Sequence, residues 1–109
     1  MKLSEKHCQA CAPGTPALAG PETRAMLEQV PQWRLLESGG AISRDFVFDT
    51  YWAGVVFVNA VAWIAQKEQH HPDMELGYKK VGVRFSTHAA KGLTENDFIC
   101  AAKVDRLLE

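Results

Sequence analysis

Three of the four histidines in the chain stand at points where regular structure is expected to end. His70 and His71 are adjacent and precede Pro72, and His88 follows a segment of alternating hydrophobic residues. Near neutral pH, a neutral imidazole accepts a proton and an imidazolium donates one. Several histidines around one ligand can therefore move protons in both directions. The pattern predicts acid–base chemistry on a small molecule.

Asp97 is a candidate to orient one of these imidazoles or to stabilise its charged form. Two simpler interpretations stay open. The segment Thr94-Glu95-Asn96-Asp97 has the form of a helix capping box, with Asp in place of the usual Glu. The pair His70 and His71 would also suit the carboxyl end of a helix, where positive charge is favoured.

A zinc site is a third interpretation, because imidazoles and carboxylates are zinc ligands. The sequence has no spaced H-x-x-x-H pattern, and adjacent histidines on a helix point about 100° apart. We therefore expect no metal at these histidines. His7, Cys8 and Cys11 near the N-terminus would need a fourth ligand for a structural zinc site. They are read either as such a site or as reduced thiols on a mobile arm.

The elements that must position these residues can be read from hydrophobic periodicity and from Gly and Pro signals. The expected order is helix, two strands, helix, two strands, helix. A Gly-Gly pair in Ser38-Gly39-Gly40-Ala41 predicts a hairpin between the first two strands, because glycine readily takes positive φ. The expected helices cover 21–30, 51–69 and 94–108, and the expected strands cover 33–37, 42–48, 74–78 and 81–85.

Segregated helices and hairpins favour an α+β fold. We expect a single domain at 21–109, with a four-stranded antiparallel sheet and helices packed on one face. The other face would need a partner subunit or a ligand to cover it. Pro and Gly punctuate residues 1–20, so this segment is expected to be a flexible arm in which little can pack.

Length and composition narrow the class of protein. The chain has 109 residues, 47% of them hydrophobic, which fits one domain with an ordinary core. Its net charge of −1 gives no support for nucleic acid as a partner. The most apolar stretch, residues 51–65, is shorter than a membrane span, and we find no secretory signal. Three cysteines, an odd number, argue against a disulfide framework and fit a reducing cytoplasm.

The stretch HHPDMELGYKKVGVRFSTHAAKGLTENDF resembles the pterin-4α-carbinolamine dehydratase family. The upstream segments LEQVPQW and RDFVFDTYWAGVVFVNAVAWIA also fit, so the resemblance covers roughly residues 21–107. The bacterial branch of the family that is associated with phenylalanine hydroxylase is resembled by three segments of this chain, HCQAC, KGL and NDFI. The motifs that carry the resemblance are His70-His71-Pro72, Tyr78, Thr87-His88, Gly92-Leu93-Thr94 and Asp97.

The resemblance implies a 4a-hydroxytetrahydrobiopterin dehydratase, a lyase that eliminates water from 4a-hydroxytetrahydropterin to give quinonoid dihydropterin. This reaction recycles the pterin of aromatic amino-acid hydroxylases, with pterin as the substrate and with no further cofactor or metal. We expect His70 and His88 to form the acid–base pair, with His71 binding and assisting. The catalytic positions implied by the family are His70, His71, His88 and Asp97. The substrate-binding positions are His70, His71, Pro72, Thr87, His88, Ala89 and Ala90, with support from Gln66 and Tyr78.

Two positions depart from the common family pattern. Gln66 stands where many members carry Glu, and Ala89 stands where many members carry an acidic residue. Glutamine keeps hydrogen bonds but lacks the negative charge that raises the pKa of a nearby histidine. The three histidines and Asp97 remain, so an active enzyme is expected.

The resemblance also bears on partners. The family forms dimers and tetramers, so a homodimer or homotetramer is expected, with an aromatic amino-acid hydroxylase as functional partner and with neither nucleic acid nor membrane. Animal members also act as dimerisation cofactors for a homeodomain transcription factor. The alternative function is therefore a non-catalytic dimerisation or regulatory module for a hydroxylase or a transcription regulator.

Overall fold

The computed structural model describes residues 1–36 and 39–109, and the predicted elements are found in the predicted order. The expected end of the first strand at Glu37 and the start of the hairpin at Ser38 lie outside the described residues. The helices are η1 (Leu3–Glu5), α1 (Gly20–Leu27), α2 (Tyr51–Glu68), η2 (His88–Ala90) and α3 (Glu95–Arg106), where η marks a 3-10 helix. The strands are β1 (Arg34–Leu35), β2 (Ile42–Val47), β3 (Asp73–Leu76) and β4 (Lys80–Phe85).

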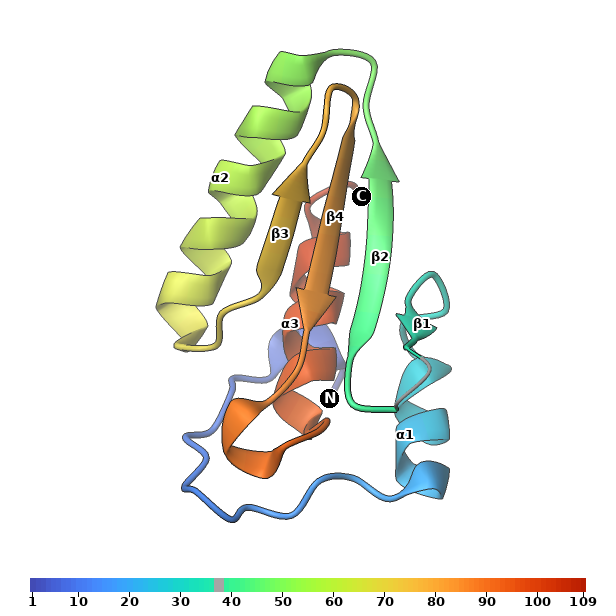
Figure 1. The fold of residues 1–109 in the computed structure, drawn as a ribbon, viewed down its shortest axis with the longest axis vertical. Coiled ribbons are helices and arrows are strands. Elements are labelled where there is room, and N and C mark those ends of the chain that lie inside the picture. The colour runs from blue at the N-terminus through green and yellow to red at the C-terminus, as the bar shows by residue number, and fades with distance from the viewer. Residues whose placement is uncertain (37–38) are drawn as a thin grey trace.

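The four strands form one antiparallel sheet in the order β1-β2-β4-β3. The helix α3 crosses behind the sheet, and α2 runs beside β3 (Figure 1). The predicted α+β class, with its four-stranded antiparallel sheet, is confirmed. The loop that follows β4 lies against the start of α3, where the Thr87 and Thr94 hydroxyls are 2.8 Å apart.

Alternation along β4 explains why helices cover one face of the sheet. Val81, Val83 and Phe85 are buried, whereas Lys80 and Arg84 are exposed. Phe46 of β2 pairs with Val81 and is also buried. Full burial of one such side chain stabilises the fold by about 1.5–3 kcal/mol. The hydrophobic parity of β4 therefore fixes which face meets the helices.

The end of α2 sets the direction in which the two adjacent histidines leave the helix. The predicted helix ended at Gln69; in the structure it ends at Glu68, and Gln69 is the cap, with a left-handed φ of 54°. The backbone N–H of His70 still donates to the Ala65 carbonyl at 3.2 Å. This turn takes His70 off the helix axis before Pro72, so the pair does not simply continue the helical surface.

The segment 1–20 packs more than the sequence suggested. Leu3 is buried in the core, so the expectation that little of this segment can pack is wrong there. The side chain of Lys103 in α3 donates to the Ser4 carbonyl at 3.0 Å, and the N–H of Leu18 donates to the Leu93 carbonyl at 2.8 Å. The division of the chain at residue 21 and the flexibility of the arm stay predictions.

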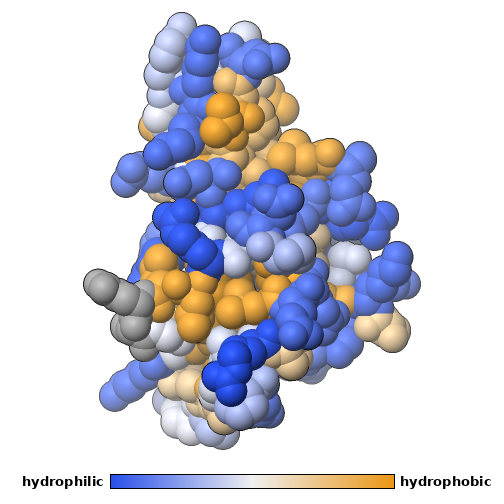
Figure 2. All heavy atoms as spheres, turned by 90° about the vertical axis from the view of Figure 1, so that its right-hand side faces the viewer, coloured by the Kyte–Doolittle hydropathy of each residue, from blue (hydrophilic) through white to orange (hydrophobic). Residues whose placement is uncertain are grey.

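The surface is mixed in character. Figure 2 shows the side on which β2 lies, where hydrophobic areas are separated by hydrophilic side chains. Leu35 of β1 and Val47 of β2 are among the exposed hydrophobic residues. Within residues 1–36 and 39–109, no helix combines the length and hydropathy that a bilayer crossing requires.

Candidate active site

A cavity of about 340 Å³ lies where three segments distant in sequence meet. One segment is residues 69–71, just after α2, and the second is residues 86–89, just after β4. The third is residues 9–11 of the N-terminal arm, and Asn96 of α3 completes the lining. The volume lies within the range of about 300–1,000 Å³ typical of small-molecule sites. His70, His71 and His88 all border this one cavity.

His70 is the most enclosed of the three, with 12% of its side chain exposed. Its Nε2 atom lies 2.6 Å from Oδ1 of Asp97, whose side chain is fully buried. The imidazole also stacks on the ring of Phe85, with centroids 6.0 Å apart and planes 7° from parallel. These two contacts fix both the position and the tilt of the ring. When Nε2 carries the proton toward Asp97, Nδ1 carries the free lone pair.

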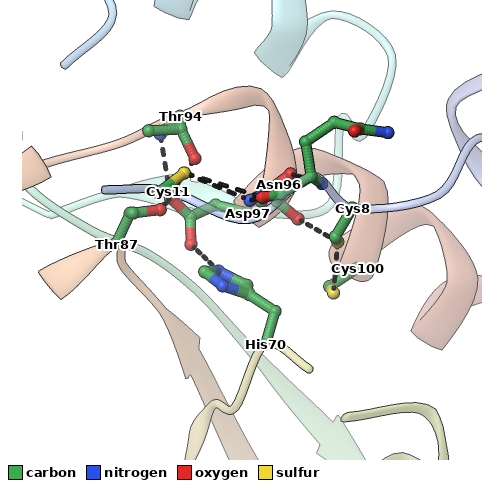
Figure 3. Close-up of polar contacts among 9 residues, drawn as sticks. Cys8, Cys11, His70, Thr87, Thr94, Asn96, Asp97 and Cys100 are labelled. Carbon is green, nitrogen blue, oxygen red and sulfur yellow. Dashed lines mark hydrogen bonds and ion pairs between the residues drawn. The ribbon is translucent and has the colours of Figure 1, made fainter. Parts of the chain in front are cut away.

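Asp97 is held by a second set of hydrogen bonds (Figure 3). Its Oδ2 atom accepts from the Thr87 hydroxyl at 2.8 Å and from the Thr94 backbone N–H at 3.0 Å. The bond from Thr94 is the return half of the capping box that the sequence indicated. Asp97 therefore makes the contacts of both interpretations: Oδ2 caps the helix, and Oδ1 contacts the His70 imidazole.

His71 and His88 are exposed, in contrast to His70. The loop that carries His88 is closed by Thr87 and Gly92, whose backbones pair, with the Thr87 N–H donating to the Gly92 carbonyl at 2.8 Å. Lys91, at φ 53°, completes the reversal. The site thus combines one enclosed, anchored imidazole with two that meet solvent.

Several predicted residues do not border the cavity. Gln66 is exposed on α2, and its backbone carbonyl accepts from the side chain of Gln69, which does line the cavity. Tyr78 is exposed in the turn between β3 and β4, at the opposite end of β4 from His88. Pro72 and Ala90 flank the lining segments without lining the cavity. The predicted residues that the structure does bring together are His70, His71, Thr87, His88, Ala89 and Asp97.

The sequence-based list missed the contribution of the arm and of Asn96. The arm borders the cavity through Gln9, Ala10 and Cys11. Asn96 was read only as part of the capping motif. The HCQAC segment was noted for its thiols and its family likeness, and nothing local indicates that it reaches a loop more than 60 residues away.

His7, Cys8 and Cys11 do not converge on a common point. Within the described ranges, no three or more His, Cys, Asp or Glu side chains are grouped so as to hold a metal ion. Burial and the contact with Cys8 raise the pKa of the Cys100 thiol, the contact being the larger effect. The nearest polar partners of the three side chains are Oε2 of Glu68 for His7 (2.9 Å), Sγ of Cys100 for Cys8 (3.5 Å) and the Asn96 amide for Cys11 (3.5 Å).

Comparison with known proteins gives a consistent result. The family model described as "Pterin 4 alpha carbinolamine dehydratase" matches residues 16–107. A protein of Nitrosomonas eutropha named "Putative pterin-4-alpha-carbinolamine dehydratase" is 49% identical over 107 residues, covering 97% of this chain and 93% of its own.

Solved structures with a similar fold carry related descriptions. The crystal structure of a transcriptional coactivator/pterin dehydratase from Brucella melitensis has a TM-score of 0.81 and 29% identity, covering 85% of this chain and 99% of its own. A pterin dehydratase-like protein identified as a RuBisCO assembly factor in the alpha-carboxysome has a TM-score of 0.61 and 23% identity. It covers 70% of this chain and 88% of its own, and at this identity it shares the fold alone.

Proposed function

Since this chain belongs to the pterin 4 alpha carbinolamine dehydratase family, we propose that it eliminates water from 4a-hydroxytetrahydropterin to give quinonoid dihydropterin. The observation that carries the proposal is the contact between His70 and buried Asp97 at a cavity that His71 and His88 also border. The reaction would return the pterin of an aromatic amino-acid hydroxylase to a form that can be reduced again.

The elimination breaks the bond between C4a and its hydroxyl oxygen. The leaving hydroxyl takes a proton and departs as water, and the proton on N5 is removed as the N5=C4a double bond forms. One group must therefore donate a proton while another accepts one. Two imidazoles in opposite protonation states meet this need without a covalent intermediate.

His70 is suited to accept the proton from N5. Its Nε2 faces Asp97, which leaves Nδ1 as the ring nitrogen able to take a proton. The carboxylate then stabilises the imidazolium that forms, as a buried aspartate does for a catalytic histidine. Phe85 keeps the ring from rotating away.

His88 is suited to donate a proton to the leaving hydroxyl, and His71 to bind the substrate beside it. Both are exposed, so solvent can restore their protons after each turnover. Thr87 and Ala89 line the same cavity on either side of His88, so this segment is suited to contact the substrate. Support for this division of roles comes from the difference in enclosure between His70 and the other two histidines.

The direct test is the decay of the 4a-hydroxy adduct. A hydroxylase generates the adduct at alkaline pH, where spontaneous dehydration is slow, and its absorbance is followed with and without the purified protein. We expect the protein to accelerate the decay in proportion to its concentration. An unchanged decay rate would reject the enzymatic proposal.

A binding role is the second candidate, and the outer face of α2 favours it. Trp52 and Trp63 are 69% and 64% exposed, and Val56 lies between them on the same helical face. Exposed apolar patches of this kind mark association surfaces. We propose self-association to a dimer or tetramer, with an aromatic amino-acid hydroxylase as functional partner.

Turnover separates the two functions, because a pure binding module accelerates no dehydration. Sedimentation of wild type against Trp63→Ser tests the association itself. A smaller assembly is expected for the variant, and unchanged assembly size would exclude this face from the interface.

A further inference from the structure

We propose that the arm segment Gln9–Cys11 is a substrate-binding wall of the cavity, held in place by Asn96. The inference rests on the dehydratase proposal and extends it to residues outside the 16–107 segment that matches the family. Its basis is the position of the segment, which borders the same cavity as the three histidines.

The arm is held by a two-bond clasp between Gln9 and Asn96. The Gln9 backbone N–H donates to Oδ1 of Asn96 at 3.0 Å, and Nδ2 of Asn96 donates to the Gln9 carbonyl at 2.7 Å. The oxygen and the nitrogen of the Asn96 amide thus both bond the backbone of Gln9, in the way that a neighbouring β-strand would. Asn96 is buried while Gln9 is exposed, so the two bonds are partly shielded from competition with water.

Anchors on either side confine the segment. Before it, the Cys8 N–H donates to Oε1 of Glu68 at 2.8 Å, at the end of α2. After it, the Gly14 N–H donates to the Ala89 carbonyl at 3.2 Å, in the loop that carries His88. The arm therefore bridges the two loops that supply the histidines, which is why it lies across the cavity between them.

Asn96, which forms the clasp, and Asp97, which bonds His70, are consecutive in the sequence. Asn96 holds the arm, and Asp97 holds His70, both in the first turn of α3. A displacement of that turn would move the arm wall and the His70 imidazole together. Positioning of the substrate and positioning of the base therefore share one structural element.

The side chains that the arm offers to the cavity are small. Ala10 is exposed and Cys11 is half-buried, and both line the cavity. A larger side chain at Ala10 would fill space meant for the substrate without disturbing the core. The inference therefore predicts a defect in substrate binding, separate from proton transfer.

The test compares Ala10→Phe with Ala12→Phe in the full-length protein. Both alanines are exposed on the same arm, but only Ala10 lines the cavity. We expect Ala10→Phe to raise KM for the 4a-hydroxypterin about tenfold, a typical effect of small shape changes in a pocket, with kcat changed much less. Ala12→Phe should leave both constants unchanged, and both variants should melt at the wild-type temperature.

A second measurement uses the thiol of Cys11. Saturation with 7,8-dihydrobiopterin should slow alkylation of Cys11 by iodoacetamide several-fold, as followed by peptide mass spectrometry. An active wild type whose Ala10→Phe variant has an unchanged KM, or whose Cys11 is not protected, would overturn the arm proposal and leave the dehydratase proposal intact. An inactive wild type would remove the dehydratase proposal itself.

Discussion

The Nε2 atom of His70 lies 2.6 Å from Oδ1 of Asp97, a carboxylate that is completely buried. The other carboxylate oxygen accepts from Thr87 and Thr94, so both oxygens are occupied by fixed partners. Such an arrangement is costly to break, because any partner removed leaves a buried polar group unsatisfied. The orientation of the imidazole thus depends on the capping turn of α3.

Replacement of Asp97 by asparagine keeps the shape of the side chain and removes its charge. The imidazolium formed during the reaction would lose its stabilising partner, so we expect kcat to fall by about 10²–10⁴-fold. Steady-state kinetics measure the effect. The matched control is Asp73→Asn, since the Asp73 side chain is mostly exposed and outside the cavity, and it should retain the wild-type kcat. A folded Asp97→Asn protein with kcat within twofold of wild type would refute the role of the carboxylate.

Thr87→Val tests the support behind Asp97. The hydroxyl of Thr87 is buried and bonds both Asp97 and, at 2.8 Å, the Thr94 hydroxyl. Valine has nearly the same volume but leaves Asp97 and Thr94 without this partner. The free energy of unfolding, measured with urea, should therefore fall by about 1–3 kcal/mol. The control is Thr15→Val, which removes an exposed hydrogen bond to the Ala12 carbonyl and should lower the free energy of unfolding clearly less. Equal losses in the two variants would show that the buried network adds nothing to stability.

Glu68 links the arm to α2 and should make stability depend on pH. Burial raises its pKa, but bonds from the Cys8 N–H and His7 and the charge of Lys103 outweigh burial and lower the pKa below 4.5. A carboxyl whose folded pKa is depressed stabilises the protein above its unfolded pKa, and this stabilisation is lost as the pH falls through the folded pKa.

The Glu68→Gln variant should therefore be less stable than wild type at pH 7 by about 1.5–3 kcal/mol, the usual contribution of hydrogen bonds to a charged group. The difference should shrink in acid, as the pH falls through the lowered folded pKa of Glu68. Urea titrations at pH 7 and at an acidic pH measure the difference in the free energy of unfolding, with Glu75→Gln, at an exposed position, as the control. A difference of the same size at both pH values would contradict the assignment.

Local sequence patterns predicted the elements well. The alternation of Val81, Val83 and Phe85 was enough to place β4 and its buried face, because a strand with one covered face repeats every two residues. The helical period identified α2 to within one residue. The exception at its end came from Gln69, whose left-handed conformation is not expected of a glutamine.

The site could be predicted only in part. His70, His71 and His88 were identified from residue type and family likeness. Their relation to Gln9 and Asn96 was not, because those residues meet across 87 positions of sequence and neither has a distinctive local pattern. Tyr78 lies at the opposite end of β4 from His88, and its supporting role stays a prediction, since conformity to a motif does not say which end of a strand a residue occupies.

The most direct test of the account follows the decay of the 4a-hydroxytetrahydropterin adduct with four proteins. These are wild type, His70→Ala, His88→Ala and, as control, His7→Ala, which removes the one histidine that does not line the cavity. Wild type and His7→Ala should accelerate decay equally, and each of the other two variants should be slower by about 10²-fold or more. Wild-type rates in both His70→Ala and His88→Ala would contradict the account.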